Sequence, residues 1–384
     1  MPRLVRVPRN VSRCSSAAAG RTVHVHLASP RGFTLVELLM VIAIIGILVG
    51  MGVVGINAGA KAIQKRAIAL EVAAISQAVE AYKMKYGDYP PDGSSRTAFE
   101  AHFRKAFPNI AASEFTAVYL SANSLADAML TMPPARQTVM DPAEALVFCL
   151  GGFSNNPQKP FTGPGGPLAQ ITGNFNPPIF QYNTERSSGF FEFTQDKLSL
   201  ILSQDTEFTN RPPSHSGAPP YTLSSDEESL QVSNARNDIL PVYRPRGRTA
   251  PLVYFAASTY ANAGYMSPTT GAARPYKSEQ VNTTVNFVQA TADKYYKYMN
   301  DKSFQIVSAG LDDAFGGVAA PQFYTFPSGK LINIFQVDQQ DRPNALDLPL
   351  ASGYQNPDPS NAGPSPQLDN VTNFSEGPLE DSLP

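Results

Sequence analysis

The chain has 384 residues, of which 42% are apolar, so it can form one large domain or two of ordinary size and cannot be wholly disordered. Residues 1–32 contain six arginines and no acidic residue, whereas the rest of the chain carries 24 basic against 32 acidic groups, and nucleic acid is therefore not an expected partner. With only two cysteines, Cys14 and Cys149, the chain has neither a disulfide framework nor a four-cysteine zinc site.

An uncharged apolar segment follows this basic start. The 19 residues Leu38–Ile56 carry no charged side chain, and a helix of that length spans about 28 Å, close to the hydrocarbon thickness of a bilayer. Because the arginines precede the segment and the acidic excess follows it, we expect a single-pass protein with residues 1–32 in the cytoplasm and the large domain outside. Five glycines leave open whether the stretch unwinds locally or packs closely in lipid: Gly46, Gly50, Gly52, Gly55 and Gly59.

The junction between the basic and apolar parts has a specific pattern. A plain membrane anchor does not account for Glu37, because a carboxylate at the head of an apolar helix requires a cationic partner. Residues 31–39, RGFTLVELL, resemble the processing site of type IV pilins and type II secretion pseudopilins. The resemblance implies that a prepilin peptidase removes the leader 1–32 by cutting after Gly32 and that Phe33 becomes an N-methylated amino terminus. It also implies that Glu37 neutralises the amino group of a neighbouring subunit during assembly.

Beyond the apolar segment the pattern stays helical and becomes amphipathic over residues 58–91. Apolar residues recur three and four positions apart, as on one face of a helix: Ile68, Val72, Ile75, Val79, Tyr82 and Tyr86. We therefore expect one long helix to Tyr86, with residues 33–57 in the membrane, ended by Gly87 and the prolines after it. Residues 82–91, YKMKYGDYPP, resemble the helix exit of major pseudopilins.

Residues 92–338 are expected to form a periplasmic α+β domain. The part from 92 to 150 is mostly helical in pattern, whereas 151–250 contains 12 prolines and is typical of a large Pro/Gly-rich, loop-rich insertion. The expected fold is α+β and pilin-like, with the long amino-terminal helix packed on an antiparallel β-sheet.

Several short segments are candidates for the elements of this domain. Ala-rich stretches around 97–106 and 122–130 indicate helices, Ala145–Leu150 a helix or strand, and Phe190–Phe193 with Leu198–Leu202 a hairpin or strands. Three β-rich segments are expected to pair in the antiparallel sheet: Leu252–Ala257, Phe304–Ser308 and Leu331–Phe335.

One acidic loop is a candidate calcium site. Residues 304–317, FQIVSAGLDDAFGG, resemble the carboxyl-terminal strand and loop of pseudopilins, in which such a loop can bind Ca²⁺. Calcium takes six to eight oxygen ligands, so Asp312 and Asp313 would need backbone carbonyls and a further acid such as Asp338. An Asp-Asp turn between two strands is the alternative. Residues 339–384, acidic and rich in proline, are expected to be a disordered tail.

No catalytic motif is present, so we expect a protein that is not an enzyme. Phosphate-binding loops, GxSxG and HExxH patterns are absent. After removal of the leader only His102 and His215 remain as histidines, and Cys149 lies in an apolar run typical of a buried thiol.

The resemblance implies a pseudopilin, a structural subunit of a type II secretion pseudopilus that takes part in protein secretion. Its expected partners are other pilin-like subunits, the prepilin peptidase and an inner-membrane assembly platform, and its expected location is the bacterial inner membrane. A type IV pilus subunit is the near alternative. A membrane-tethered extracytoplasmic enzyme or binding module with a pilin-like leader is the alternative from another class.

Overall fold

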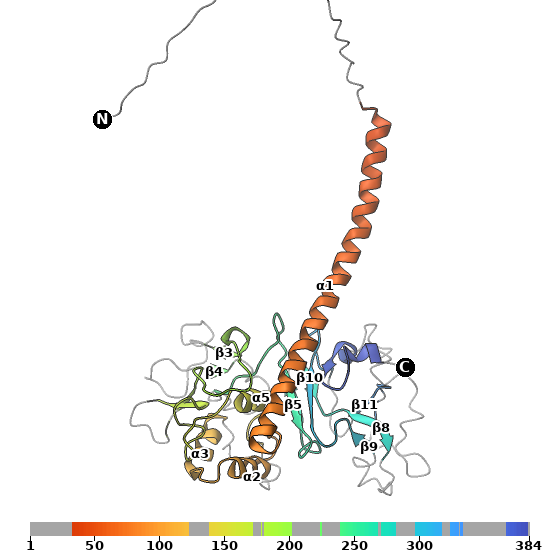
Figure 1. Ribbon diagram of the computed structural model, residues 1–384. Helices are drawn as coiled ribbons and strands as arrows, with labels where there is room; N and C mark the ends of the chain where they lie inside the picture. The colour runs from red at the N-terminus through yellow and green to blue at the C-terminus, as the bar shows by residue number, and fades with distance from the viewer. Residues whose placement is uncertain are drawn as a thin grey trace, which may run out of the picture. The chain divides into compact units, whose positions relative to one another are not determined.

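The fold is seen in a computed structural model of the chain (Figure 1). It describes residues 33–122, 138–171, 178, 180–201, 223–224, 239–267, 270–281, 296–316, 323–329, 331–332 and 366–382, without the side chains of 51–58, 200–201, 223–224, 281, 323, 331–332 and 366–367. The chain divides into two compact units, Met1–Asn57 and Ala58–Pro384.

The first element is the long helix α1, Leu35–Tyr86. It confirms the prediction of one continuous helix, and it ends at Gly87, whose φ of +84° is a left-handed conformation that few other residues tolerate. The apolar positions identified from the periodicity are buried, with Tyr86 partly so: Ile68, Val72, Ile75, Val79 and Tyr82.

Three shorter helices follow among the described residues: α2, Arg96–Ala106; α3, Ala112–Ser121; and α5, Pro142–Leu150. The side chain of Ser95 caps α2, and Asp141 and Glu144 form a reciprocal capping box at the start of α5. The expected helix around 97–106 is confirmed, and Ala145–Leu150 belongs to a helix. The stretch 123–130 lies outside the described residues.

Within the described part of the chain the strands are short and form five small sheets. β1, Leu168–Gln170, pairs with β2, Phe180–Tyr182; β3, Leu200–Ile201, with β4, Leu223–Ser224; and β6, Tyr265–Ser267, with β7, Gly271–Ala273. β5, Val253–Ala256, and β13, Val371–Thr372, flank β10, Phe304–Ser308. The four-stranded sheet has β8, Lys277–Val281, between β9, Tyr296–Tyr298, and β11, Phe323–Phe326. β11 pairs on its other edge with β12, Leu331–Ile332. The described residues also include three 3₁₀ turns: η2, Gln195–Lys197; η7, Pro366–Asp369; and η8, Leu379–Ser382.

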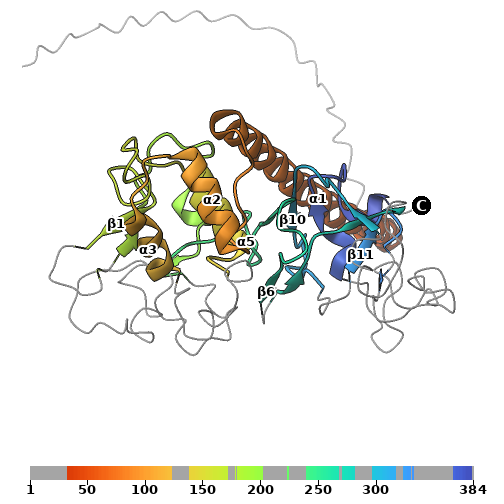
Figure 2. The same ribbon diagram turned by 90° about the horizontal axis from the view of Figure 1, so that it is seen from below.

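The sheet of β13, β10 and β5 is buried on both faces. Successive residues of a strand point to opposite faces. In β5, Tyr254 and Ala256 belong to a first apolar cluster that contains the buried face of α1, whereas Val253 and Phe255 belong to a second cluster. Figure 2 shows α2, α3 and α5 on one side of β10 and β11 on the other. The expected combination of a helix and antiparallel strands is therefore present, although β8 and β11 run parallel.

Two sequence predictions about the sheet and the tail are wrong. The segment at Leu331 does not join β5 and β10 but pairs with β11, and the third strand of the central sheet is β13.

Residues 366–382 are ordered rather than a disordered tail, because Val371 and Leu379 are buried and the Asn373 side chain accepts a hydrogen bond from the Ile306 amide at 2.9 Å. Residues 333–365 lie outside the described part of the chain. The predicted strands at Phe190–Phe193 are also not found, since this stretch is irregular.

A buried carboxylate connects the exit of α1 to the central sheet. Asp92 has no exposed surface and accepts four hydrogen bonds. Its Oδ1 accepts from the amide and hydroxyl of Ser94 at 3.1 and 2.6 Å, and its Oδ2 accepts from the amide of Ala256 at 3.0 Å and the hydroxyl of Thr259 at 2.6 Å. Four donors therefore replace the water lost by this anion on folding.

Replacing Asp92 by alanine is expected to lower the free energy of unfolding by roughly 3–5 kcal/mol, because buried donors lose their acceptor. Urea unfolding of the full chain in nonionic detergent, followed by tyrosine fluorescence, measures the change. The exposed Asp196 of η2 is the control, and Asp196→Ala should change stability by less than about 0.5 kcal/mol. Equal effects of the two substitutions would contradict the role of Asp92.

Candidate processing and assembly site

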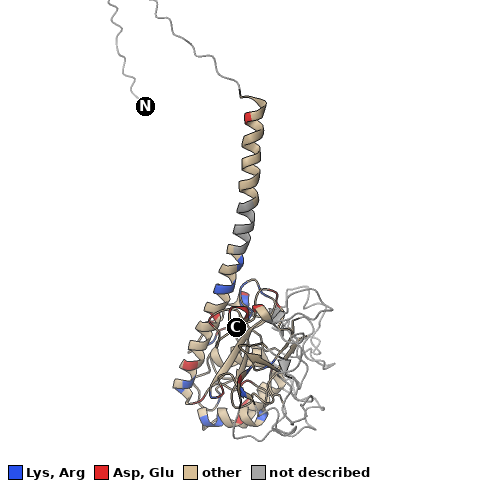
Figure 3. Ribbon diagram, turned by 90° about the vertical axis from the view of Figure 1, so that its right-hand side faces the viewer, with Lys and Arg blue, Asp and Glu red and all other residues tan. Residues whose placement is uncertain are grey.

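The amino-terminal turn of α1 carries the described part of the predicted processing site. Gly32 lies outside the described residues, whereas Phe33 is described and is 80% exposed. Thr34 follows as the residue before the helix, and Glu37 lies in its first turn. In Figure 3 the first turn of α1 carries an acidic residue, and the tan turns between it and the grey segment carry no charge.

Thr34 and Glu37 form a reciprocal capping arrangement. The amide and the hydroxyl of Thr34 both donate to Oε2 of Glu37 at 2.9 Å, and the amide of Glu37 donates to the Thr34 hydroxyl at 3.2 Å. This is the Thr-x-x-Glu capping box, which satisfies amides that the first turn of a helix leaves unpaired. The pattern is visible in the sequence, but the sequence analysis assigned Glu37 only an intermolecular role. The carboxylate thus has a local function in the single chain as well.

The apolar surface that follows Glu37 is exposed in the single chain. Large apolar side chains of α1 from Phe33 to Val49 are 45% to 80% exposed. Within the part of the chain that the structure describes, no helix combines the length and the hydropathy needed to cross a bilayer. The segment Leu38–Ile56 extends into residues 51–58, whose side chains are not described, and its membrane-spanning role stays a prediction.

A comparison with protein families identifies this region. Residues 28–53 match the family model described as the prokaryotic N-terminal methylation motif. The chain carries a prepilin-type leader motif. The match includes Gly32, Phe33 and Glu37, and this motif is characteristic of type IV pilins and pseudopilin-like proteins, whose precursors are processed by prepilin peptidase and assemble with other pilin-like subunits. Neither the curated proteins nor the solved structures contain a match to this chain.

The candidate calcium loop has its carboxylates engaged with the protein. Asp313, at a φ of +60°, accepts hydrogen bonds from the amides of Thr249 and Ala250 at 2.9 and 3.1 Å, and its other oxygen lies 3.7 Å from Arg248. The described residues contain no group of three or more His, Cys, Asp or Glu side chains placed to hold a metal ion. Asp338 lies outside them, so the calcium site stays a prediction.

Asp312 lies beside a second carboxylate, Asp369 of η7. Oδ2 of Asp369 accepts from the amides of Leu311 and Asp312 at 2.6 and 3.2 Å, and Oδ1 of Asp312 accepts from the amide of Ala314 at 2.8 Å. The pKa of Asp312 is raised to about 6, mainly by partial burial and also by the neighbouring charge of Asp369, while the hydrogen bond from Ala314 acts to lower it. The folded chain therefore favours a protonated carboxyl here.

Cys149 and His102 both lie at least partly within the interior of the domain. Cys149 is fully buried, and burial raises the pKa of its thiol far from the range of a nucleophilic thiolate. Nε2 of His102 lies 2.7 Å from the hydroxyl of Tyr82, and burial lowers the pKa of His102 to about 4. His215 lies outside the described residues.

The raised pKa of Asp312 predicts a pH-dependent stability. Because its pKa is higher in the folded chain than in the unfolded one, its contribution is fully present below about pH 4 and is lost as pH rises through about 6. Asp312→Asn, which cannot ionise and keeps an acceptor for Ala314, should be more stable than wild type at pH 7.5 by about 1 kcal/mol after allowance for solvent screening, and equal to it at pH 4.

Urea unfolding at the two pH values measures this difference. Asp313→Asn is the matched control, because it weakens the contacts with Arg248 and the two amides and should destabilise the chain at neutral pH. A gain for Asp312→Asn that is the same at both pH values would exclude titration of Asp312 as its cause.

Proposed function

We propose that the protein is a pseudopilin, a structural subunit of a type II secretion pseudopilus that is assembled through α1 and takes part in protein secretion. The observation that carries this proposal is the methylation motif at residues 28–53, with Gly32, Phe33 and Glu37 at the positions that processing and assembly require. In this proposal the protein starts as a single-pass precursor in the bacterial inner membrane with its large domain in the periplasm, where it acts as a non-enzymatic subunit.

The distribution of apolar surface on α1 supports a polymer. Between Ile68 and Tyr82 one face of the helix is buried in the domain. From Phe33 to Val49 the large apolar side chains are 45% to 80% exposed, and a surface of this kind requires a bilayer or neighbouring helices. A subunit that passes from the membrane into a bundle of its own kind meets both needs with one segment.

A type IV pilus subunit fits the motif equally well, because the leader is common to both filaments. The helix exit at residues 82–91, with its YGDYPP sequence, favours the pseudopilus by resemblance. A membrane-tethered module that uses the leader for export alone would need neither the charge of Glu37 nor contact between copies.

We expect the mature chain to begin at an N-methylated Phe33. Mass spectrometry of the protein from membranes of a host with active prepilin peptidase tests this expectation, because one intact mass reports both cleavage and methylation. Gly32→Leu should leave the leader in place without preventing insertion, since a bulky side chain shields the scissile bond. A different amino terminus, or an uncleaved wild-type chain in that host, would refute the assignment.

Two substitutions separate the charge of Glu37 from its capping role. Glu37→Gln removes the charge but keeps an acceptor suited to the capping box, whereas Thr34→Ala removes the cap and keeps the charge. If Glu37 neutralises a neighbouring amino group, cross-linking between subunits should fall at least about tenfold in Glu37→Gln and persist in Thr34→Ala, with both chains processed.

The converse result has a distinct meaning. Normal cross-linking of a processed Glu37→Gln chain would leave the carboxylate as a helix cap only. Absence of cross-links in the processed wild type would contradict the filament itself.

A further inference from the structure

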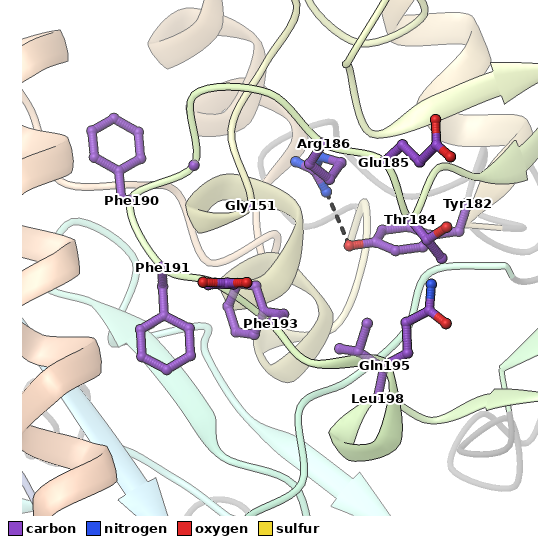
Figure 4. A pocket seen from close by; sticks show the side chains of 12 residues that line it. Gly151, Tyr182, Thr184, Glu185, Arg186, Phe190, Phe191, Phe193, Gln195 and Leu198 are labelled. Atoms are coloured by element: carbon purple, nitrogen blue, oxygen red, sulfur yellow. Dashed lines mark hydrogen bonds between the residues drawn. The ribbon is translucent and has the colours of Figure 1, made fainter.

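A cavity lies in the insertion 151–250, the part of the chain to which the leader motif gives no role. Its volume is about 390 Å³, within the range of small-ligand and side-chain pockets. Tyr182, Phe191 and Phe193 contribute rings to its lining, and Glu185 and Glu192 contribute carboxylates. In the view of Figure 4, Phe191 and Phe193 lie on one side and Tyr182 and Glu185 on the other.

The arginine in the lining is committed to the protein. Nε and Nη2 of Arg186 donate to the carbonyl of Gly152, Nη2 also donates to the carbonyl of Phe148 at 2.8 Å, and Nη1 donates to the hydroxyl of Tyr182 at 3.1 Å. Arg186 therefore binds carbonyls at and just beyond α5, where the helix dipole is negative. Its donors hold the cavity wall in place and are not directed to an anionic ligand.

Other cations near the cavity also have partners. Lys85 lies 5.3 Å from the centre of the Phe190 ring, and Lys197 forms an ion pair with Glu71 at 2.7 Å. These contacts show that rings and carboxylates of this region already bind ammonium groups.

Glu185 and Glu192 remain available. Both are exposed, and among the described residues neither carboxylate forms an ion pair or hydrogen bond through its side chain. With Arg186 they give the lining a net negative charge, and Glu192 lies in sequence between the rings of Phe191 and Phe193, whose centres are 4.9 Å apart. Aromatic rings beside free carboxylates are complementary to a cation with an apolar stem.

We propose that this cavity binds a lysine or arginine side chain from an extended segment of a protein partner. Charge complementarity with Glu185 and Glu192 selects the cation, and the rings cover its methylene stem. The proposal does not rest on processing of the leader or on a filament that α1 forms.

The absence of tryptophan in the chain gives a selective assay. The probe is the peptide acetyl-Lys-Trp-Lys-amide, whose tryptophan emission is followed while full-length protein in nonionic detergent is added. The matched probe has both lysines Nε-acetylated, which removes the charge and keeps the stem. We expect saturable binding of the charged peptide, about fivefold weaker binding of the acetylated one, and weakening of the charged complex by salt.

Variants locate the site. Glu185→Gln with Glu192→Gln should weaken binding of the charged peptide by about fivefold or more, whereas Glu279→Gln, an exposed acid of β8 outside the cavity lining, should not change it. All three positions are exposed, so folding is not at risk. Equal affinity for both peptides, unchanged affinity in the double variant, or no saturable binding would each overturn the proposal.

Discussion

The interaction on which the domain depends is the burial of the Asp92 carboxylate among four donors. An uncompensated anion in an apolar interior costs several kcal/mol, so the chain after α1 can occupy this place only when Ala256 and Thr259 bring their donors to it. The Tyr254 hydroxyl adds a bond to the carbonyl of Pro90 at 2.8 Å. The end of α1 and the strand β5 are thereby fixed together across 164 positions of sequence, and the first apolar cluster forms between them.

Parts added around this connection use the same principle of buried acids that accept amides. Glu114 of α3, 1% exposed, accepts from the amides of Phe161 and Thr162 at 2.7 and 2.9 Å and so holds the start of the insertion. Asp369 does the same for the loop after β10. Because each carboxylate organises backbone that has no regular secondary structure of its own, a domain with many prolines can still have a defined interior.

Local patterns predicted the local structure well and the distant pairings poorly. The buried face of α1 and its end at Gly87 follow from a three- and four-residue period and from glycine chemistry, both of which act within a few residues. The pairing of β13 with β10 depends on Val371 and on the Asn373 side chain. Both residues lie in a proline-rich, acidic stretch, and a prediction from the average composition of that stretch did not identify them. At the processing site the motif identified Glu37, while its bond to Thr34 required attention to capping as well as to family resemblance.

The place of β13 in the sheet has a consequence for biosynthesis. β10 lies between β5 and a strand supplied by residues 371–372, so its second edge stays open until those residues have left the ribosome and, for an exported chain, the translocation channel. An open strand edge is a template for pairing with other chains. Residues 371–372 thus close the edge of the central strand only after the intervening residues 309–370 have emerged.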